Sequence, residues 1–179
     1  MGNQHSDEEL IASSRNGEMA AFKMLVERYE GKVAGVIKPM LGDTAQAVDV
    51  GQEVFIRFYE SLDKFKGESS LGTYLIRIAI NLSLNEIKRS KRNDKIFRPL
   101  EKGQHVKADE AVVDVHEMVH YEIGKLDSEF KTVVTLRMIE GYSTEETSKI
   151  LNIPLGTVLS RLSRAQKKLK DALDKHRSS

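Results

Sequence analysis

The sequence contains no cysteine among its 179 residues. Disulfide bonds, thiolate metal sites and cysteine nucleophiles are therefore excluded, and the composition fits a reducing compartment. The sequence also has no apolar run near the roughly 20 residues that a membrane-spanning helix needs. Its amino terminus is polar and acidic, unlike the basic and then apolar start of a signal peptide. We therefore expect a soluble cytoplasmic protein that is not itself in the membrane.

The formal net charge is only +1, yet the charges are segregated along the chain. One basic block contains Lys88, Arg89, Lys91, Arg92, Lys95 and Arg98, and a second covers residues 161–177. Between them lies an acidic connector with Asp109, Glu110, Asp114, Glu117 and Glu122. Either block alone would indicate no more than a solvated surface. Two basic zones together suggest two contacts with a polyanion, because neutralising phosphates supplies much of non-specific affinity.

Helical periodicity covers almost all of the sequence, and no segment shows the alternation of a β-strand. Ser6 and Glu9 form a capping box that predicts a first helix, and Gly17 is typical of its end. An apolar stripe at helical spacing then stops near Gly42, and its members are Phe22, Leu25, Val26, Tyr29, Val33, Val36 and Ile37. Two further helices are predicted over about residues 44–62 and 71–89.

The segment Asn93–Ala108 contains Pro99 and Gly103, mixes charges and has no clear period, which is typical of a linker. We therefore expect an all-α fold with two small helical domains joined by a flexible acidic linker. The predicted segments are 1–92, 93–115 and 116–179. A chain of 179 residues can hold two such domains, each with a modest core.

The segment Leu126–Leu173 predicts three consecutive helices, of which the last two form a helix-turn-helix. Ser143 can cap the second helix while Glu146 reaches back, and Asn152 suits the sharp turn that follows. Pro154 sits where a helix can begin without its amide hydrogen. In the last helix, apolar residues expected to face inward recur at steps of three or four: Val158, Leu162, Ala165, Leu169 and Leu173.

The opposite face of that last helix carries hydrogen-bond donors and cations, namely Thr157, Ser160, Arg161, Arg164 and Lys168. A helix that lies in the major groove of DNA needs such a stripe. Most charged faces of helical bundles only contact solvent. A capped helix, a short turn and a basic helix in this order nevertheless favour DNA binding.

The predicted helix over 44–62 has two distinct faces. Its expected buried face contains Val48, Gly51, Phe55, Phe58 and Leu62. A second face carries Asp49, Gln52, Glu53 and Ile56. Taken alone, this acidic face is about as typical of solvent contact as of a site for a partner helix.

In the predicted helix over 71–89, the residues expected to face the core are Leu71, Leu75, Ile78 and Leu82. Its polar stripe is formed by Tyr74, Arg77, Asn81, Asn85 and Lys88. Such a stripe suits a nucleic-acid strand, because bases stack on rings, amides read base edges and cations hold phosphates. The preceding loop, FKGESS at 65–70, has a glycine pivot and could hold an extruded base. Without further context, a polar helix face usually only meets solvent.

Three sequence signatures follow one another along almost the entire chain. The first is DVGQEVF at 49–55, the second is FKGESSLGTYLIRIAIN at 65–81, and the third combines Gly141, Ser143 and Glu146 with the run Ile153–Leu162. In this order and spacing, they resemble the signatures of the extracytoplasmic-function sigma factors of bacterial RNA polymerase, within the sigma-70 family.

This resemblance implies a sigma factor, and not an enzyme, that binds core RNA polymerase and directs promoter recognition and DNA melting. The coiled coil of the polymerase beta-prime subunit would be contacted by Asp49, Gln52, Glu53 and Ile56. A further set of residues would melt and read the minus-ten element and capture a flipped base. These residues are Lys66, Gly67, Glu68, Ser69, Ser70, Tyr74, Arg77, Asn81, Asn85 and Lys88. The minus-thirty-five element would be read by Pro154, Gly156, Thr157, Ser160, Arg161, Arg164 and Lys168.

The resemblance also implies an anti-sigma factor as a partner, and no cofactor, metal or small-molecule substrate. The acidic connector would thread toward the polymerase active-site cleft and mimic nascent RNA. Two residues depart from the family pattern. Tyr74 replaces the usual tryptophan and would still stack, with a smaller ring face. Leu159 replaces a lysine or arginine, and it either touches a thymine methyl or, as we slightly prefer, widens the apolar stripe beside Val158 and Leu162.

Two other functions compete with this one. His116, Glu117 and His120 match His-Glu-x-x-His, the spacing of zinc peptidases. Three fixed positions within five residues often arise by chance, so we favour coincidence. A dimeric helix-turn-helix repressor or activator would share the last module. It would also need a dimerisation or effector domain, where this chain instead carries the minus-ten-like signature.

Overall fold

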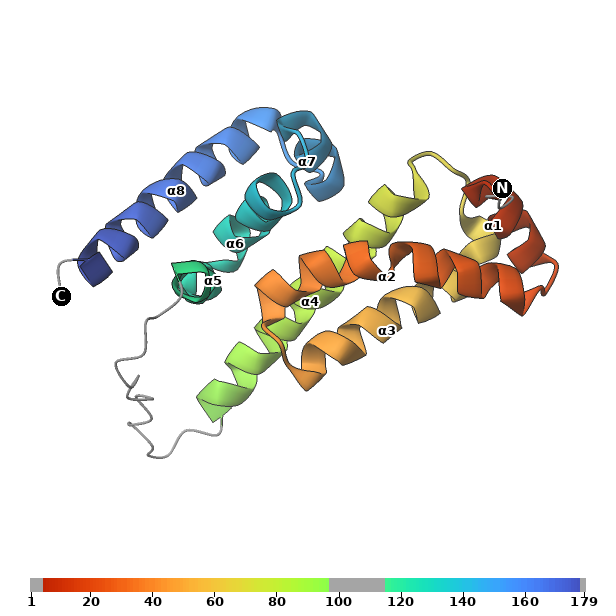
Figure 1. Ribbon diagram of the computed structural model, residues 1–179, viewed down its shortest axis with the longest axis horizontal. Coiled ribbons are helices and arrows are strands. Elements are labelled where there is room, and N and C mark those ends of the chain that lie inside the picture. Colours follow the sequence, from red (N-terminus) through yellow and green to blue (C-terminus); the bar gives the residue numbers. More distant parts are fainter. Residues whose placement is uncertain (1–4, 97–114, 178–179) are drawn as a thin grey trace.

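The structure, a computed structural model, describes residues 5–96 and 115–177, which contain helices and turns and no β-strand. The prediction of an all-α fold is therefore confirmed. The first group of helices comprises α1 (Asp7–Arg15), α2 (Met19–Leu41), α3 (Ala45–Glu60), the short 3₁₀ helix η1 (Leu62–Lys64) and α4 (Leu71–Ile96). The second comprises α5 (Val115–Lys125), α6 (Ser128–Val134), the π-helical turn η2 (Thr135–Ile139), α7 (Thr144–Leu151) and α8 (Leu155–Arg177). Figure 1 shows the two groups as two halves of the molecule.

Local signals explain most helix ends in the first half. The Ser6 hydroxyl accepts a hydrogen bond from the Glu9 amide at 3.2 Å, and the Glu9 carboxylate accepts one from the Ser6 amide at 2.8 Å, which confirms the capping box. Gly17 follows α1 with a φ of +89°, which a residue with a side chain rarely adopts. Helix α4 continues to Ile96, beyond the predicted end near residue 89, because the next helix-breaking residue in the sequence is Pro99.

The core of the first half lies between α2, α3 and α4, with α1 packed against one end. Its largest fully buried side chains are Phe58, Leu25, Ile37 and Leu75. From α1, Leu10 and Ile11 join the same core. These contacts fix the backbone of α3 and α4, which with the loop between η1 and α4 carry the predicted contact residues of this half.

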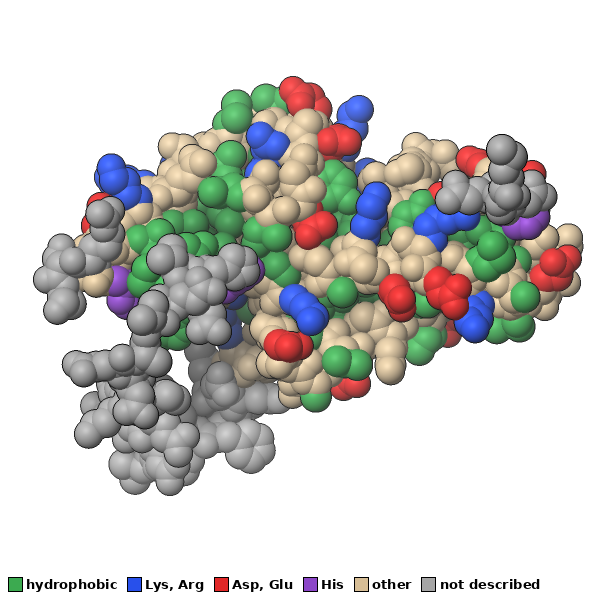
Figure 2. All heavy atoms as spheres, in the orientation of Figure 1, with side chains coloured by type: hydrophobic (Ala, Val, Ile, Leu, Met, Phe, Trp, Pro, Cys, Tyr) green, Lys and Arg blue, Asp and Glu red, His purple; other side chains and the backbone are tan. Residues whose placement is uncertain are grey.

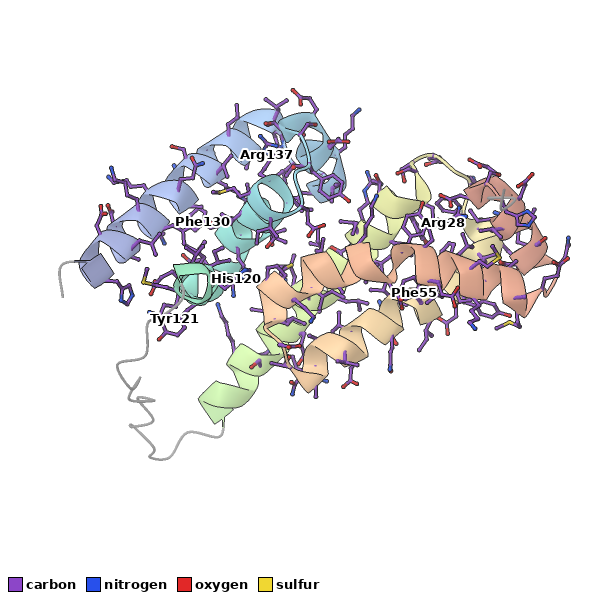
Figure 3. All side chains as sticks on the ribbon, viewed as in Figure 1. Arg28, Phe55, His120, Tyr121, Phe130 and Arg137 are labelled. Carbon is purple, nitrogen blue, oxygen red and sulfur yellow. The ribbon has the colours of Figure 1, made fainter. Side chains whose placement is uncertain are left out.

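The second half has its own core between α5, α6 and α8, formed by Ile123, Phe130, Val134, Ala165 and Leu169. Phe130 points from α6 toward α8 (Figure 3), and hydrophobic side chains show between α8 and its neighbours α5 and α6 (Figure 2). A buried carboxylate accompanies this core. Glu122 accepts hydrogen bonds from Lys125 at 2.8 Å and shares one with His176 at 3.0 Å. The Lys125 hydrogen bond, with that from His176, outweighs burial and lowers the pKa of Glu122.

Glu122 is therefore a buried part of α5, and assigning it to an acidic connector was wrong. Of the other acidic residues in that connector, Asp109, Glu110 and Asp114 lie outside the described residues. Residues 93–96 of the predicted linker belong to α4, and Val115 begins α5. Within the described ranges, no helix has both the length and the apolar character required to cross a membrane.

A third buried cluster joins the two halves. Val36 and Met40 from α2 and Ile76 and Ile80 from α4 pack with two residues of the second half, Leu136 and Ile150. Beside this cluster, the Glu140 carboxylate lies so close to Gly35 that a Cβ there would meet Glu140 Oε1 at 2.5 Å. Ile76 and Ile80 were not predicted to be buried, because a single apolar face was expected on this helix. Helix α4 has two.

Candidate nucleic-acid and polymerase interface

The acidic face predicted on α3 is open to solvent. Asp49 and Gln52 are exposed, and Ile56 keeps 52% of its surface accessible. Glu53 is half-buried and accepts a 2.7 Å hydrogen bond from Arg57 Nε, one turn further along the helix. This face therefore combines carboxylates, an amide and one exposed apolar side chain. Such a combination can pair with a basic helix through both charge and buried apolar area.

An apolar groove of about 490 Å³ lies beside this face, between α2 and α3. Two residues that line this groove, Val48 and Phe55, had been predicted to belong to the buried face of α3. Val48, expected in the core, is 58% exposed on the groove, and Phe55 is half-buried between α2 and α3 (Figure 3). Of the predicted buried residues, Phe58 and Leu62 are buried as expected, and the other buried residues of α3 are Ala47, Val50 and Val54. Apolar residues cover so much of the α3 circumference that periodicity alone could not choose between the two registers.

The predicted minus-ten residues lie on the loop between η1 and α4 and on α4 itself. Gly67 has a φ of +70°, which supports its expected role as the pivot of the loop. Ser70 caps α4 by accepting a 3.2 Å hydrogen bond from the Thr73 amide. Loop and helix enclose a hollow of about 330 Å³, lined by Lys64, Phe65, Lys66, Gly67, Glu68, Ser69, Tyr74 and Arg77. Further along α4, Asn81, Asn85 and Lys88 are exposed, so the stripe is continuous with this hollow.

Tyr74 is more deeply engaged than the sequence suggested. Its ring lies 4.9 Å from the Phe65 ring and 6.1 Å from the Phe58 ring, measured between centroids. Its hydroxyl lies 2.9 Å from Ser61 Oγ. The side chain is only half-exposed, so it forms a wall of the hollow and part of the aromatic core at once.

Arg77 reaches across to the second half of the molecule. Its Nη2 donates a 2.7 Å hydrogen bond to the backbone carbonyl of Lys149, near the end of α7. A carbonyl in the last turn of a helix carries partial negative charge and suits a cation. In this arrangement, a cation predicted to hold DNA is bonded to the protein itself.

The helix-turn-helix is formed by α7 and α8, as predicted. The Ser143 hydroxyl accepts a hydrogen bond from the Glu146 amide at 3.1 Å, and the Glu146 carboxylate accepts one from the Ser143 amide at 2.7 Å. Asn152 adopts the left-handed conformation, with a φ of 52°. Pro154 directly precedes α8, and its carbonyl accepts a 3.2 Å hydrogen bond from the Val158 amide. Of the apolar stripe predicted to face inward, Val158, Ala165 and Leu169 are buried, while Leu162 and Leu173 are half-buried.

The outward face of α8 carries the predicted minus-thirty-five residues. Pro154, Gly156, Ser160 and Arg164 are exposed, and Thr157 is half-buried. Leu159 is 49% exposed on this helix, so our preferred interpretation, that it widens the buried apolar stripe, was wrong. Together with Leu155, which is 41% exposed one turn earlier, it presents an apolar surface suited to a thymine methyl group.

Two of the predicted DNA-binding cations are paired with acids beside the start of α6. Arg161 Nη2 lies 2.9 Å from a Glu129 carboxylate oxygen. Lys168 Nζ lies 3.0 Å from Asp127 Oδ2 and over the ring of Phe130. The hydrogen bond from Lys168 lowers the pKa of Asp127. Sequence reasoning missed both acids, because their distance in sequence from α8 hides the contact. Their only local signal was a place near a helix N-terminus, where acids are common.

The His-Glu-x-x-His pattern falls at the start of α5. The side chains of His116 and Glu117 lie outside the described part of the structure, and His120 is exposed. Among the described side chains, no group of three His, Cys, Asp or Glu residues is placed to hold a metal ion. The described residues thus lend the zinc alternative no support.

Comparison with known proteins agrees with this geometry. Residues 25–93 match the family "Sigma-70 region 2", and residues 116–169 match "Sigma-70, region 4". The chain is 33% identical to the ECF RNA polymerase sigma-E factor of Haemophilus influenzae, over 97% of this chain and 98% of that protein. Two solved structures share the fold. The first is CnrH in complex with the cytosolic domain of CnrY, with 25% identity and a TM-score of 0.66 over 93% of this chain and 96% of that chain. The second is the sigma factor RpoE of Bartonella quintana in complex with the anti-sigma factor NepR, with 20% identity and a TM-score of 0.68 over 86% of this chain and 96% of that chain. The chain therefore belongs to the sigma-70 family of RNA polymerase sigma factors, in its extracytoplasmic-function branch.

Proposed function

We propose that this sigma factor binds core RNA polymerase and directs it to promoters, where it recognises two DNA elements and melts the DNA. One observation carries the proposal. The two family matches, to regions 2 and 4, fall on the two helical halves, and none of the predicted contact residues is buried. We assign residues 1–92 to polymerase binding and the minus-ten element, 93–115 to the linker, and 116–179 to the minus-thirty-five element.

Polymerase binding is assigned to the exposed face of α3. Asp49, Gln52 and Glu53 supply polar contacts for the basic coiled coil of the beta-prime subunit, and Ile56 supplies an apolar one. Isoleucine side chains exposed among charges are common, so exposure alone carries little weight. The assignment is supported by the match of this helix to region 2 and by the apolar groove beside it, which adds area for a helical partner.

DNA melting is assigned to the loop 66–70 and the polar stripe of α4. A base that leaves the stack needs a cavity with an aromatic wall and polar edges. The hollow beside Tyr74 and Arg77 provides both, and Asn81, Asn85 and Lys88 continue the path for the strand. The outward face of α8 would enter the major groove at the minus-thirty-five element.

We further infer an anti-sigma factor as a partner, and a cytoplasmic location where polymerase and DNA are available. The inference rests on the solved structures with this fold, in which the RpoE protein is bound to an anti-sigma factor and CnrH to the cytosolic domain of CnrY.

The test is run-off transcription from a promoter library with bacterial core polymerase. The wild type is compared with a triple variant in which Asp49, Gln52 and Glu53 are replaced by alanine. We expect promoters to be enriched only with the intact protein, and their sequences to define both elements. The matched control replaces Glu27, Gln166 and Asp171, which are exposed elsewhere, by alanine and should retain activity.

A dimer that binds DNA unaided and enriches no promoter would contradict the proposal and favour the repressor. Equal loss of activity in the two triple variants would instead contradict the assignment of the α3 face.

A further inference from the structure

Helix α1 precedes the residues that match the region 2 family, yet its last residue contacts the start of the predicted minus-ten loop. Arg15 Nε donates a 3.0 Å hydrogen bond to the carbonyl of Leu62, and Arg15 Nη2 donates a 2.5 Å hydrogen bond to the carbonyl of Phe65. One guanidinium thus holds two carbonyls on either side of a single turn.

These two carbonyls lie at the two ends of η1. Leu62 begins η1, and Phe65 is its extended C-cap, with φ −70° and ψ 109°. The Leu62 carbonyl also accepts a 3.3 Å hydrogen bond from the Phe65 amide within η1, whereas the Phe65 carbonyl follows the last helical residue. Carbonyls in the last turn of a helix carry partial negative charge, so a cation is favourable there. The planar fork of arginine can bond two acceptors at once, which a lysine ammonium cannot do with the same fixed geometry.

The contact fixes one end of the loop, and a cap fixes the other. Phe65 is held by its carbonyl through Arg15 and by its ring through Tyr74. At the far end, Ser70 caps the first turn of α4. Between these two points, residues 66–69 arch over the hollow with Gly67 in the left-handed region. The position of Phe65 therefore sets where the arch begins and how wide the hollow is.

Arg15 is not needed to dock α1. Leu10 and Ile11 of this helix are buried in the core of the first half. At the opposite end of α1, Arg28 Nη1 lies 2.6 Å from Asp7 Oδ1 and ties the helix to α2 (Figure 3). The two arginines thus have different roles, because Arg28 holds α1 to α2 and Arg15 joins α1 to the loop.

We infer that Arg15 is a positioning residue for the minus-ten element, which acts by anchoring the loop that receives the extruded base. The inference rests on the proposed function of that loop. It adds a residue outside the segment matched to region 2 to the set that determines promoter preference.

The experiment compares Arg15→Ala, Arg15→Lys and the matched control Arg28→Ala in the full chain with core polymerase. Competition between promoters that differ at single minus-ten positions measures base preference. Competition at the minus-thirty-five element and the affinity for core polymerase serve as internal references. Hydrogen exchange of the Lys64 and Phe65 amides, which donate to the Ser61 carbonyl at 2.9 and 3.0 Å, reports on the loop anchor without any promoter.

Arg15→Ala should reduce the preference for the extruded base about tenfold, as expected from the loss of hydrogen bonds from a charged group. It should also speed exchange at both amides and leave the two references unchanged. Arg15→Lys should recover part of the preference, and Arg28→Ala should leave preference and exchange as in the wild type.

Unchanged exchange and preference in Arg15→Ala would overturn the inference. Equal losses at both promoter elements and in polymerase affinity would also overturn it, since Arg15 would then only support the fold. A wild-type protein without any base preference would instead contradict the proposed function of the loop, and the exchange data would still show whether Arg15 anchors it.

Discussion

The hydroxyl of Tyr74 shares a hydrogen bond with Ser61, and its ring packs against Phe58 and Phe65. The side chain lines the hollow beside the loop and also a second hollow between α3 and α4, so a base could reach it from either side. The side chain therefore serves a structural purpose whatever DNA it meets. The sequence predicted an aromatic on the polar stripe correctly, but it could not show that three aromatic residues from different segments converge there.

Tyr74→Phe should lower the free energy of unfolding by about 1 kcal/mol, because it removes one partly buried hydrogen bond and keeps the ring. Promoter melting, followed by the reactivity of unpaired thymines, should remain close to wild type. Tyr121→Phe is the control, since Tyr121 is 62% exposed and should change neither quantity. A large loss of melting with unchanged stability would show that the hydroxyl itself contacts DNA.

Ser143 offers a second test at a single residue. Replacing it by alanine removes the hydroxyl that accepts from the Glu146 amide, so the free energy of unfolding should fall by about 1 kcal/mol. Urea denaturation measures the change. Ser163→Ala, at an exposed position inside α8, should cost little or slightly stabilise the protein. Equal effects of the two substitutions would argue against the capping box as the source of stability.

Among the elements, α8 combines an outward basic face with two acids that neutralise part of it. Arg161 and Lys168 are paired with Glu129 and Asp127. Surface pairs contribute little to stability, so these acids affect DNA binding more than folding. They reduce the positive potential of α8 until phosphates replace them.

Glu129→Gln should therefore tighten binding of the full chain to duplex DNA and steepen its salt dependence by about one unit of slope, because Arg161 becomes available to a phosphate. Fluorescence anisotropy at several salt concentrations measures both effects. Asp171→Asn removes a negative charge from the same domain without freeing Arg161, and it should change the slope less. If the two variants behave alike, net charge and not the pairing controls affinity.

Local signals predicted the elements well where a single residue determines the backbone. Ser143, Asn152 and Pro154 each occupy the predicted place around the turn, because capping, the left-handed conformation and the missing amide hydrogen act over a few residues. The predicted buried face of α3 was wrong in its first half and right at Phe58 and Leu62, since Val48 and Val50 are both apolar and only the packing of α2 and α4 decides which one is buried. The contact of Arg77 with Lys149 also depends on tertiary packing, and no local pattern indicates it.

For the molecule as a whole, the two promoter elements are too far apart for the arrangement seen here. Their names place them 25 base pairs apart, or about 85 Å along B-DNA. Arg77, expected at the minus-ten element, lies 2.7 Å from the carbonyl of Lys149 in the helix-turn-helix. We therefore expect both elements to be occupied only after the two halves separate and the cluster between α2, α4, η2 and α7 opens.

Ile80→Asp should favour the open arrangement, because it places a carboxylate in the cluster that joins the halves. Small-angle scattering should show a larger radius of gyration than for the wild type. Ile56→Asp, at an isoleucine exposed to solvent, is the control and should leave the radius unchanged. An unchanged radius in Ile80→Asp at full helix content would contradict the role of the cluster in holding the halves together.

Glu140 should make the joint between the halves sensitive to pH. Burial raises the pKa of this carboxyl, and Lys32 of α2 only partly opposes the shift. Its other titratable neighbour, Tyr142, has a pKa that is raised by burial and by Glu140 itself. Because the closed form holds the proton more tightly, closure should strengthen as pH falls and weaken as pH rises through the raised pKa, above the ordinary value of 4.5.

Scattering or domain-to-domain energy transfer across this pH window should show the shift toward the closed form in acid. Glu140→Gln should abolish most of it, because the amide does not titrate. An identical pH profile in the variant would assign the effect to another group.

The buried cluster that joins the halves also affects how long the free protein survives in a cell. When the halves part, Val36, Met40, Ile76 and Ile80 are left as one bare apolar patch on α2 and α4. Patches of this kind attract chaperones and proteases, and degradation often follows the population of the opened state. The fraction of time spent open would thus set the turnover of the protein as well as its readiness for polymerase, so any partner that covers the patch would lengthen its life.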